Sequence, residues 1–392
     1  GNWEFLMQLA NNGMMPWVIG ILIGSLLEAA YLLRWFGFAA KLETDTKNEA
    51  TYSIHKLVPI LFFGLILYLF SYFSSQWMTI NPVPYYLPFV LIIIIFVLDF
   101  LPVYIKNTVA IAGMGYYAYT LITQSLLPEQ DILRIVFTGI FLAGGLLMLI
   151  PGYTKKGARK GFYPLVLLMF TGLGGLIQAE STLQFFFAWE IMTISSYLLI
   201  LRGKNARKPA LNYILFSIGG AYLMLAGFAM AYQFHGNFTL QILTNTSGIA
   251  SWIFLLVAIG LMSKIATIGV HIWLPGSYAE AEDDVTPMIS SILIKSGVFG
   301  FLIFMLSGNG FNIGNVNIPY ILGWLGAISA VVGNMMAIYQ EDVKKLVAYS
   351  SIGVMGYILF AVSMMTNLGW LTAITYGMLH FLYKGLLFLA VA

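Results

Sequence analysis

Five ionisable residues lie inside strongly apolar stretches of the sequence: Glu190, Lys264, Lys295, His380 and Lys384. The clearest case is FFFAWEIMTISSYLLI, in which the one charged residue, a glutamate, has no acid or base near it. A buried carboxylate and a buried ammonium that face each other share a proton and a charge, and a third charge can displace both. Such groups, spread over several helices and joined by water, could pass a proton from one to the next.

The composition of the chain explains why these positions are unusual. The 392 residues are 60% hydrophobic and 9% charged, with a mean hydropathy of +0.86. Soluble domains carry about 25% charged residues. Apolar runs of roughly 20 residues recur along the whole chain, each long enough to cross a bilayer as a helix, and they lack the alternation of a membrane barrel. We therefore predict an all-α polytopic membrane protein.

The apolar runs predict about 13 transmembrane helices, with boundaries accurate to a few residues. The expected spans lie at about 15–35, 54–74, 85–104, 107–125, 132–150, 161–180, 182–201, 209–232, 251–273, 287–306, 318–339, 344–365 and 369–392.

The basic residues predict the orientation of these spans. Fifteen of the 19 lysines and arginines fall on one side, and the positive-inside rule makes that side cytoplasmic in a multi-pass protein of the cell membrane. Arg134 sits at the opposite edge, and three lysines fall inside spans. The fifteen are Arg34, Lys41, Lys47, Lys56, Lys106, Lys155, Lys156, Arg159, Lys160, Arg202, Lys204, Arg207, Lys208, Lys344 and Lys345.

The buried charges have a functional and a structural interpretation. A charge at mid-bilayer depth costs at least a few kcal/mol. Four such charges in one chain therefore need a reason, and a proton relay provides one. The alternative is that structural ion pairs hold the helices together, or that lysines extend to an interface, which suits Lys295 best because it is nearest a cytoplasmic end. Glu190 and Lys264 make the stronger case for a relay. His380 and Lys384 are four residues apart and share one helix face.

The segment after Lys264 contains a further candidate and a weak helix. His271 lies seven residues after Lys264, on the same face two turns on, and Pro275 ends the helix. This histidine is either a relay member near the cytoplasmic mouth or a capping residue. The run GLMSKIATIG is small and polar for a membrane span. It predicts a weakened or kinked helix beside a hydrated site, or close helix packing.

Several other kinds of site are not expected. The chain has no cysteine, which excludes disulfides, thiolate nucleophiles and cysteine-held iron–sulfur clusters on it. The four histidines have no metal-ligand spacing, and no glycine-rich phosphate loop follows a strand. We therefore expect no cofactor and no metal. The net charge of +3 does not suggest a nucleic-acid partner, and a membrane enzyme such as an acyltransferase would need a paired catalytic arrangement that the spans lack.

Four stretches together resemble the antiporter-like subunits of membrane complexes: FFFAWEIMTISSYLLI, VAIGLMSKIATIGVHIWLPGSYAEAEDDVTPMISSILIKSGVFG, YQEDVKKLVAYSSIGVMGY and HFLYKGLLF. These are the proton-pumping membrane subunits of complex I, of energy-converting membrane-bound hydrogenases and of multisubunit sodium/proton antiporters. The resemblance covers about 83–392. It implies an antiporter-like fold with two inverted five-helix repeats and broken helices.

The resemblance also implies a role for each buried charge. Glu190 would pair with Lys264 in a broken helix, Lys295 would be the central base, and His380 and Lys384 would lie in the eleventh helix. A charge arriving from a neighbouring subunit would separate the pair and send the lysine's proton to the central base. A Lys or Glu in a twelfth helix would then release the proton outside.

The order of segments departs from the family. Residues 83–392 resemble helices one to eleven, with the first repeat at 161–306 and part of the second at 318–392. Residues 1–80 resemble the twelfth to fourteenth helices that end such a unit. The terminal charge would fall near Asn2, which cannot exchange a proton, and Glu4 is the candidate substitute. The run EAEDD at 280–284 also departs from the family, and we expect a solvated charge run there rather than a mouth that concentrates cations.

The predicted function is a proton-translocating subunit of a complex I-like or hydrogenase-like membrane complex. Its partners would be other membrane subunits, including further antiporter-like subunits, and a redox arm that carries the metal centres of the oxidoreductase. One alternative is a sodium/proton antiporter, multisubunit or standing alone. A second is a degenerate structural subunit, which Asn2 favours and the set of Glu190, Lys264 and Lys295 opposes.

Overall fold

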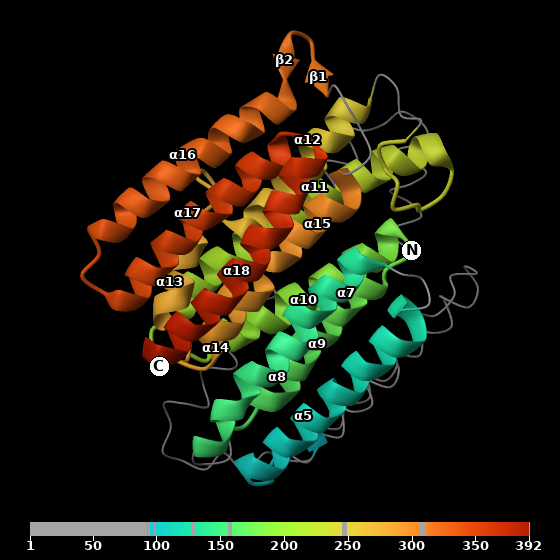
Figure 1. Ribbon diagram of the computed structural model, residues 1–392. Helices are drawn as coiled ribbons and strands as arrows, with labels where there is room; N and C mark the ends of the chain where they lie inside the picture. The colour runs from blue at the N-terminus through green and yellow to red at the C-terminus, as the bar shows by residue number, and fades with distance from the viewer. Residues whose placement is uncertain are drawn as a thin grey trace, which may run out of the picture.

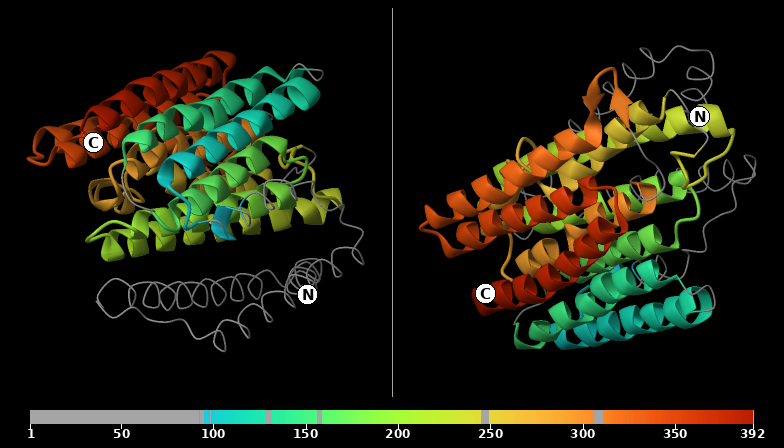
Figure 2. Two further views of the ribbon diagram at one scale, coloured as in Figure 1. Left: turned by 90° about the horizontal axis from the view of Figure 1, so that it is seen from below. Right: turned by 45° about the horizontal axis from the view of Figure 1, so that its top comes forward.

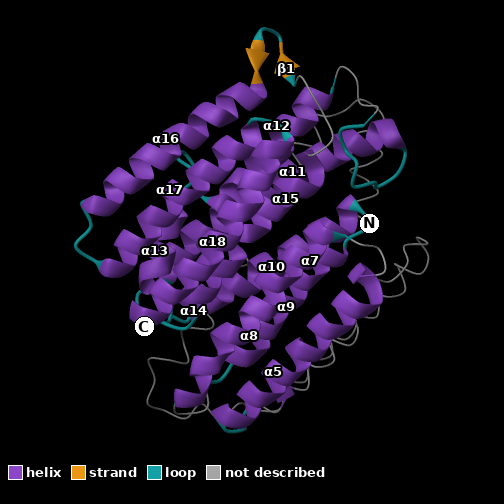
Figure 3. Ribbon diagram, in the orientation of Figure 1, coloured by secondary structure: helices purple, strands orange, loops and turns teal. Residues whose placement is uncertain are grey.

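The computed structural model describes residues 99–127, 131–155, 159–244, 249–305 and 311–391, together with Ile92 and residues 95–97. The predicted spans at 15–35 and 54–74, half of the span at 85–104, and the segment 1–80 lie outside the described residues. Within the described part, helices account for nearly all regular structure, and a single short hairpin is the exception (Figure 3).

The helices follow the predicted spans closely from 107 onward, except at two interruptions described below. Their bounds are α5 Val103–Thr120 with a π-helical turn Leu121–Leu126, α7 Ile132–Thr138 with a π-helical turn Gly139–Ala143, α8 Gly144–Leu149 with a 3-10 turn Ile150–Thr154, α9 Phe162–Gln178, α10 Thr182–Leu201, α11 Arg207–His235, α12 Ala250–Ile265, α13 Trp273–Glu280, α14 Val285–Pro287 with a π-helical turn Met288–Leu293, α15 Lys295–Met305, α16 Ile318–Ile338, α17 Val343–Ser363 and α18 Asn367–Val391. The hairpin strands are β1 Asn312–Ile313 and β2 Val316–Asn317.

The helices have the dimensions of membrane spans. In the described residues, seven helical segments are long and apolar enough to cross a bilayer, and α9 and α12 are shorter apolar helices. Pro102, Pro164 and Pro319 lie at or near helix starts, where the missing N–H costs nothing. Asp131, Ser181, Asn317 and Asp342 cap four helices by accepting a backbone N–H with the side chain.

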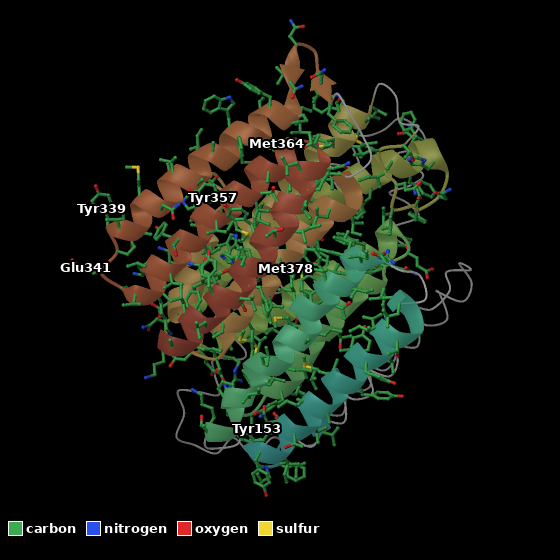
Figure 4. All side chains as sticks on the ribbon, in the orientation of Figure 1. Tyr153, Tyr339, Glu341, Tyr357, Met364 and Met378 are labelled. Carbon is green, nitrogen blue, oxygen red and sulfur yellow. The ribbon has the colours of Figure 1, made fainter. Side chains whose placement is uncertain are left out.

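The helices form a single bundle of nearly parallel rods (Figure 1). In the view of Figure 1, α16 and α17 lie on one flank, α5 and α8 lie on the other, and α10 and α15 lie between them. Seen from below, the yellow-green α11 lies on the side of the bundle away from the red α18 (Figure 2). The hairpin extends from the end of α16 opposite to Tyr339 and Glu341, which mark the turn into α17 (Figure 4).

Glycines let neighbouring helices approach closely, as is usual in membrane bundles. A Cβ on Gly172 of α9 would lie 2.6 Å from the backbone nitrogen of Met192 in α10. Gly260 of α12 is similarly placed, 2.6 Å from the carbonyl oxygen of Gly220 in α11. These contacts leave no room for larger side chains, so they hold α9 close to α10 and α11 close to α12.

The predicted span at 251–273 is wrong in its second half, because α12 ends at Ile265. Ala266 has a left-handed backbone with φ of 54°, which stops the helix, and Gly269 has φ of 98°. The chain becomes helical again only at Trp273, whose indole nitrogen donates to the carbonyl oxygen of Ser263, 2.9 Å away. That bond satisfies one of the carbonyls that a helix end leaves free. The break therefore lies within the stretch whose composition predicted a weak helix.

A second interruption precedes Lys295. Residues Met288–Leu293 form a π-helical turn between α14 and α15, inside the predicted span at 287–306. Such turns insert an extra residue into the helical ladder and often mark functional sites. Both interruptions thus fall next to a lysine that the sequence singled out.

Candidate functional site

Lys264 lies in the last turn of α12, immediately before the break, and its side chain is fully buried. Its ammonium donates to Thr193 Oγ1 at 3.1 Å, to Tyr213 Oη at 2.8 Å and to Ser217 Oγ at 3.4 Å. An ammonium has three donors, so these three hydroxyls satisfy all of them. Ser196 Oγ lies 2.5 Å from Tyr213 Oη and extends the group. We call Thr193, Ser196, Tyr213 and Ser217 the hydroxyl cage.

Aromatic rings complete the surroundings of Lys264. Its nitrogen lies 4.8 Å from the ring centre of Tyr213 and 5.5 Å from that of Trp189. A cation over such ring faces is attracted to their electrons. The end of α12 adds the negative end of a helix dipole. All hydrogen-bond partners of the buried ammonium are therefore neutral groups.

Glu190 lies one turn before Thr193 on α10, so it approaches the same region as Lys264. The two charges act on each other through space, but they form none of the ion pairs within 4.0 Å found among the described residues. Glu190 Oε1 is buried and has no hydrogen-bond partner. Glu190 and Lys264 thus interact without a direct ion pair among the described residues, and the ammonium bonds to the hydroxyl cage.

Lys295 opens α15 directly after the second interruption, and it is fully buried. Its nitrogen hydrogen-bonds to His380 Nδ1 of α18 and donates to the carbonyl oxygen of Ser290 at 3.2 Å. The alternative that Lys295 extends to a membrane interface is therefore wrong. His380 Nε2 is buried and has no hydrogen-bond partner among the described residues.

Lys384 lies one turn beyond His380, on the same buried face of α18, as the spacing of four residues predicted. Its nitrogen donates to the carbonyl oxygen of Val347 at 2.8 Å and to Ser350 Oγ, both in α17. Lys264, Lys295 and Lys384 thus come from three helices and have only neutral partners within hydrogen-bonding distance.

His271 lies in the break between α12 and α13, where it is partly exposed. Because α12 ends at Ile265, His271 is not on a continuous helix face with Lys264, and that prediction is wrong. Its Nδ1 is buried and has no hydrogen-bond partner. The structure therefore places this histidine in the break after α12, and His271 is not among the hydrogen-bond partners of the three buried lysines.

The hydroxyl cage is the part of the site that sequence reasoning missed. Hydroxyl residues are common in membrane helices, so their type alone does not mark them as part of a site. One signal was available: Tyr213 and Ser217 are four residues apart in an apolar helix, as are Trp189 and Thr193 in the preceding one. Residues at this spacing share a helix face, so each helix presents a polar stripe toward its neighbour.

The acidic run at 280–284 is paired rather than solvated. Arg159 binds Asp284 and Glu282, with its Nη2 2.8 Å from Glu282 Oε2, and Arg202 lies 3.2 Å from the same glutamate. Lys344 binds Asp283 at 2.6 Å. We call these six residues the charge clamp: Arg159, Arg202, Glu282, Asp283, Asp284 and Lys344. The expectation of a solvated charge run is wrong for Glu282, Asp283 and Asp284, since three cations from three parts of the chain pair with these carboxylates.

Arg159 is the centre of the charge clamp. Burial alone would lower the pKa of its guanidinium, but hydrogen bonds to Asp284 and the charges of Asp284 and Glu282 outweigh burial and raise this pKa above its ordinary value. The clamp ties the segment between α13 and α14 to the ends of α10 and α17. It thereby holds the chain that leads from the broken helix to Lys295.

Arg159→Gln should lower the stability of the folded protein by about 1–3 kcal/mol, because Asp284 would remain almost buried without its cation. The measurement is the midpoint of thermal unfolding in detergent. Lys204→Gln is the matched control. Lys204 is exposed, and its substitution also removes one positive charge. Equal midpoints for the two variants would show that the clamp does not stabilise this end of the bundle.

Comparison with known proteins relates the chain to subunits of respiratory and antiporter complexes. Residues 179–392 match the family model described as NADH:quinone oxidoreductase/Mrp antiporter, TM. Over 236 residues the chain is 30% identical to NAD(P)H-quinone oxidoreductase chain 4 3 of Picosynechococcus sp., covering 58% of this chain and 42% of the relative. Over 258 residues it is 28% identical to hydrogenase-4 component B of Escherichia coli, and this match covers 60% of this chain and 38% of the relative.

A solved structure has a similar fold. A chain of the membrane-bound sulfane sulfur reductase, an archaeal respiratory membrane complex, is 27% identical, with a TM-score of 0.63, and the match covers 76% of this chain and 55% of that chain. The chain spans less than half the length of the two curated relatives.

Proposed function

Because the chain belongs to the NADH:quinone oxidoreductase/Mrp antiporter transmembrane family, we propose that it translocates protons as one subunit of a larger membrane complex. The observation that carries this proposal is the set of three fully buried lysines on separate helices, each bonded to neutral groups. An ammonium inside a bilayer costs a few kcal/mol unless it is compensated. A lysine held by neutral groups alone can therefore exist as the amine or as the ammonium, which a proton carrier requires.

The proposed relay runs from Glu190 and Lys264 to Lys295 with His380, and then to Lys384. In the structure the Lys264 ammonium rests in the hydroxyl cage and leaves Glu190 Oε1 unpaired. A charge brought near Glu190 by a neighbouring subunit would change the attraction between Glu190 and Lys264. The Lys264 proton would then move toward Lys295, and His271 is the candidate for the cytoplasmic entry.

The architecture of the proposed unit follows the family. We place helices one to eleven in 83–392, with inverted five-helix repeats at 161–306 and in 318–392, and the end of a unit in 1–80, for about 13 transmembrane helices. The cytoplasmic side would be the one that carries the charge clamp. Three basic parts of the chain meet there through ion pairs. Basic loops gather on the cytoplasmic side of membrane proteins, so this clustering supports the proposed orientation and a place in the cell membrane.

The partners would be other membrane subunits, further antiporter-like subunits and a redox arm. The names of the similar proteins support this, since they include a quinone oxidoreductase chain, a hydrogenase component and a chain of a respiratory membrane complex. The family model also covers Mrp antiporters, so a multisubunit sodium/proton antiporter is the second candidate function. A degenerate structural subunit is the third.

Ion flux through the isolated complex distinguishes these functions. The complex that co-purifies with the full-length chain is placed in liposomes that contain the pH dye pyranine, and a potassium diffusion potential is imposed with valinomycin. We expect a pH change that does not depend on sodium. A pH change that requires sodium would favour the antiporter, and an unchanged pH in both conditions would contradict ion translocation.

A further inference from the structure

The break that follows Lys264 is bonded to a serine of another helix. Ile268 lies four residues after Lys264, beyond the end of α12, and its backbone N–H donates to Ser329 Oγ of α16 at 3.0 Å. Because Ile268 lies past the helical ladder of α12, its N–H must find an acceptor elsewhere. Backbone donors that are shielded from water are almost always paired. Ser329 therefore supplies the acceptor that the break requires.

The hydroxyl of Ser329 is oriented to accept. Ser329 is fully buried, and its hydroxyl donates to the carbonyl oxygen of Leu325, one turn earlier in α16, at 2.6 Å. A hydroxyl has one hydrogen to donate and two lone pairs with which to accept. Because the hydrogen is already used within α16, the oxygen offers the break lone pairs only, which suit the N–H of Ile268.

The pair formed by α16 and α17 is a firm anchor for this contact. Ser329 lies between Gly326 and Gly333, where α16 approaches the backbone of α17. A Cβ on Gly326 would lie 2.6 Å from the backbone nitrogen of Phe360, and one on Gly333 would lie 2.5 Å from that of Gly353. Backbones in such close contact resist sliding past each other, so the position of the serine is well defined.

The same pair also holds Lys384, whose ammonium is hydrogen-bonded to Ser350 of α17. Lys264 belongs instead to the last turn of α12, where the helical ladder stops. Gly260 holds that end of α12 close to α11, and Ser329 holds the chain that follows it. The serine thus relates the position of Lys264 to the pair of helices that binds the last lysine of the proposed relay.

We propose that Ser329 is a positioning residue, which keeps the Lys264 ammonium at the hydroxyl cage by tying the break to the α16–α17 pair. This inference rests on the proposed function and adds a residue that exchanges no proton itself. Without the hydroxyl, the N–H of Ile268 loses its acceptor, so the observed position of the break is less favoured. The ammonium then meets its acceptors in a smaller share of the molecules.

The test compares Ser329→Thr with Ser329→Val in the liposome assay described above. The two new side chains have nearly the same shape, and one of them keeps the hydroxyl. A threonine in a helix can bond its hydroxyl to the carbonyl one turn earlier, as Ser329 does. We expect Ser329→Val to translocate protons about fivefold more slowly than Ser329→Thr, the factor that one ordinary hydrogen bond represents. Any effect of the added methyl group is common to both variants.

Ser329→Ala gives a second comparison, because it removes the hydroxyl and adds no atom. It should be about fivefold slower than the wild type. Its control is Ser363→Ala. Ser363 of α17 also lies at the contact between the two helices, 2.8 Å from where a Cβ on Gly323 would be, but its hydroxyl donates to the carbonyl of Phe360 in its own helix. Ser363→Ala should keep the wild-type rate.

Hydrogen exchange, followed by mass spectrometry on the intact complex, separates positioning from a general loss of stability. The peptide that contains Ile268 should exchange faster in Ser329→Ala and Ser329→Val than in Ser329→Thr or the wild type. The unfolding midpoints of the Ser329 variants should stay close to that of Ser363→Ala. Equal flux in Ser329→Thr and Ser329→Val, or equal exchange of this peptide in the two, would overturn the inference.

Lys264→Met distinguishes failure of this inference from failure of the proposed function. If Lys264→Met loses its flux while Ser329→Ala and Ser329→Val keep theirs, Ser329 has no positioning role and the relay stands. If Lys264→Met keeps the wild-type rate, both the relay and the role of Ser329 are wrong.

Discussion

Glu190→Gln should lower the rate of proton translocation roughly 10- to 100-fold while the protein folds and assembles as before. The amide has nearly the same shape as the carboxylate but carries no charge, so it cannot attract the Lys264 ammonium out of the hydroxyl cage. Glu190 Oε1 has no hydrogen-bond partner to lose, and the substitution therefore removes little that stabilises the fold. The measurement is the initial rate of pH change in the liposome assay.

The control for this variant is Glu180→Gln. Glu180 is exposed and lies just before α10, about three helical turns from Glu190. Its substitution removes the same negative charge without touching the buried site. It should keep the wild-type rate. A Glu190→Gln variant that translocates protons like Glu180→Gln would show that the carboxylate is not part of the relay.

Lys264→Met should have the largest effect, a loss of about 100-fold or more in proton flux, because it removes a group that itself holds the proton. Methionine approximates the length and apolar stem of lysine, so the buried volume is nearly kept. Thr193, Tyr213 and Ser217 would lose the donor that they share. We also expect a decrease in stability of about 1–3 kcal/mol, since buried hydroxyls would lose their partner.

Two measurements on Lys264→Met separate these effects. Flux is compared with Lys344→Met, which removes a lysine of the charge clamp and leaves the buried site intact. The unfolding midpoint of each variant gives its stability. A Lys264→Met variant with the flux of Lys344→Met would indicate that the lysine is structural.

The helices could be predicted from the sequence because a bilayer requires about 20 apolar residues for each crossing. Where such runs are separated by polar loops, the position of each helix along the sequence is closely determined. Helices α10, α16 and α17 accordingly begin and end close to the predicted bounds. The end of α12 could not be placed, because a left-handed alanine at 266 has no signature in composition. The π-helical turn before Lys295 was likewise invisible, since it changes the backbone ladder without changing the apolar pattern.

The buried charges of the site could be predicted because a lysine or glutamate in an apolar run is conspicuous. Their partners could not. Lys264 bonds to hydroxyls 47 to 71 residues away in the sequence, and no spacing within one helix reveals such contacts. Arg159 finds its acidic partners more than 120 residues further on, so the acidic run was interpreted as solvated. Prediction fails where an interaction depends on which helices become neighbours.

The most direct measurement is an electron cryo-microscopy map of the complete complex at a resolution that shows ordered water. The predicted result is a hydrogen-bonded series of waters and side chains that joins Lys264 to Lys295 and continues past His380 to Lys384. A map in which apolar side chains fill the interval between Lys264 and Lys295, with no water in contact with either, would contradict translocation through these lysines.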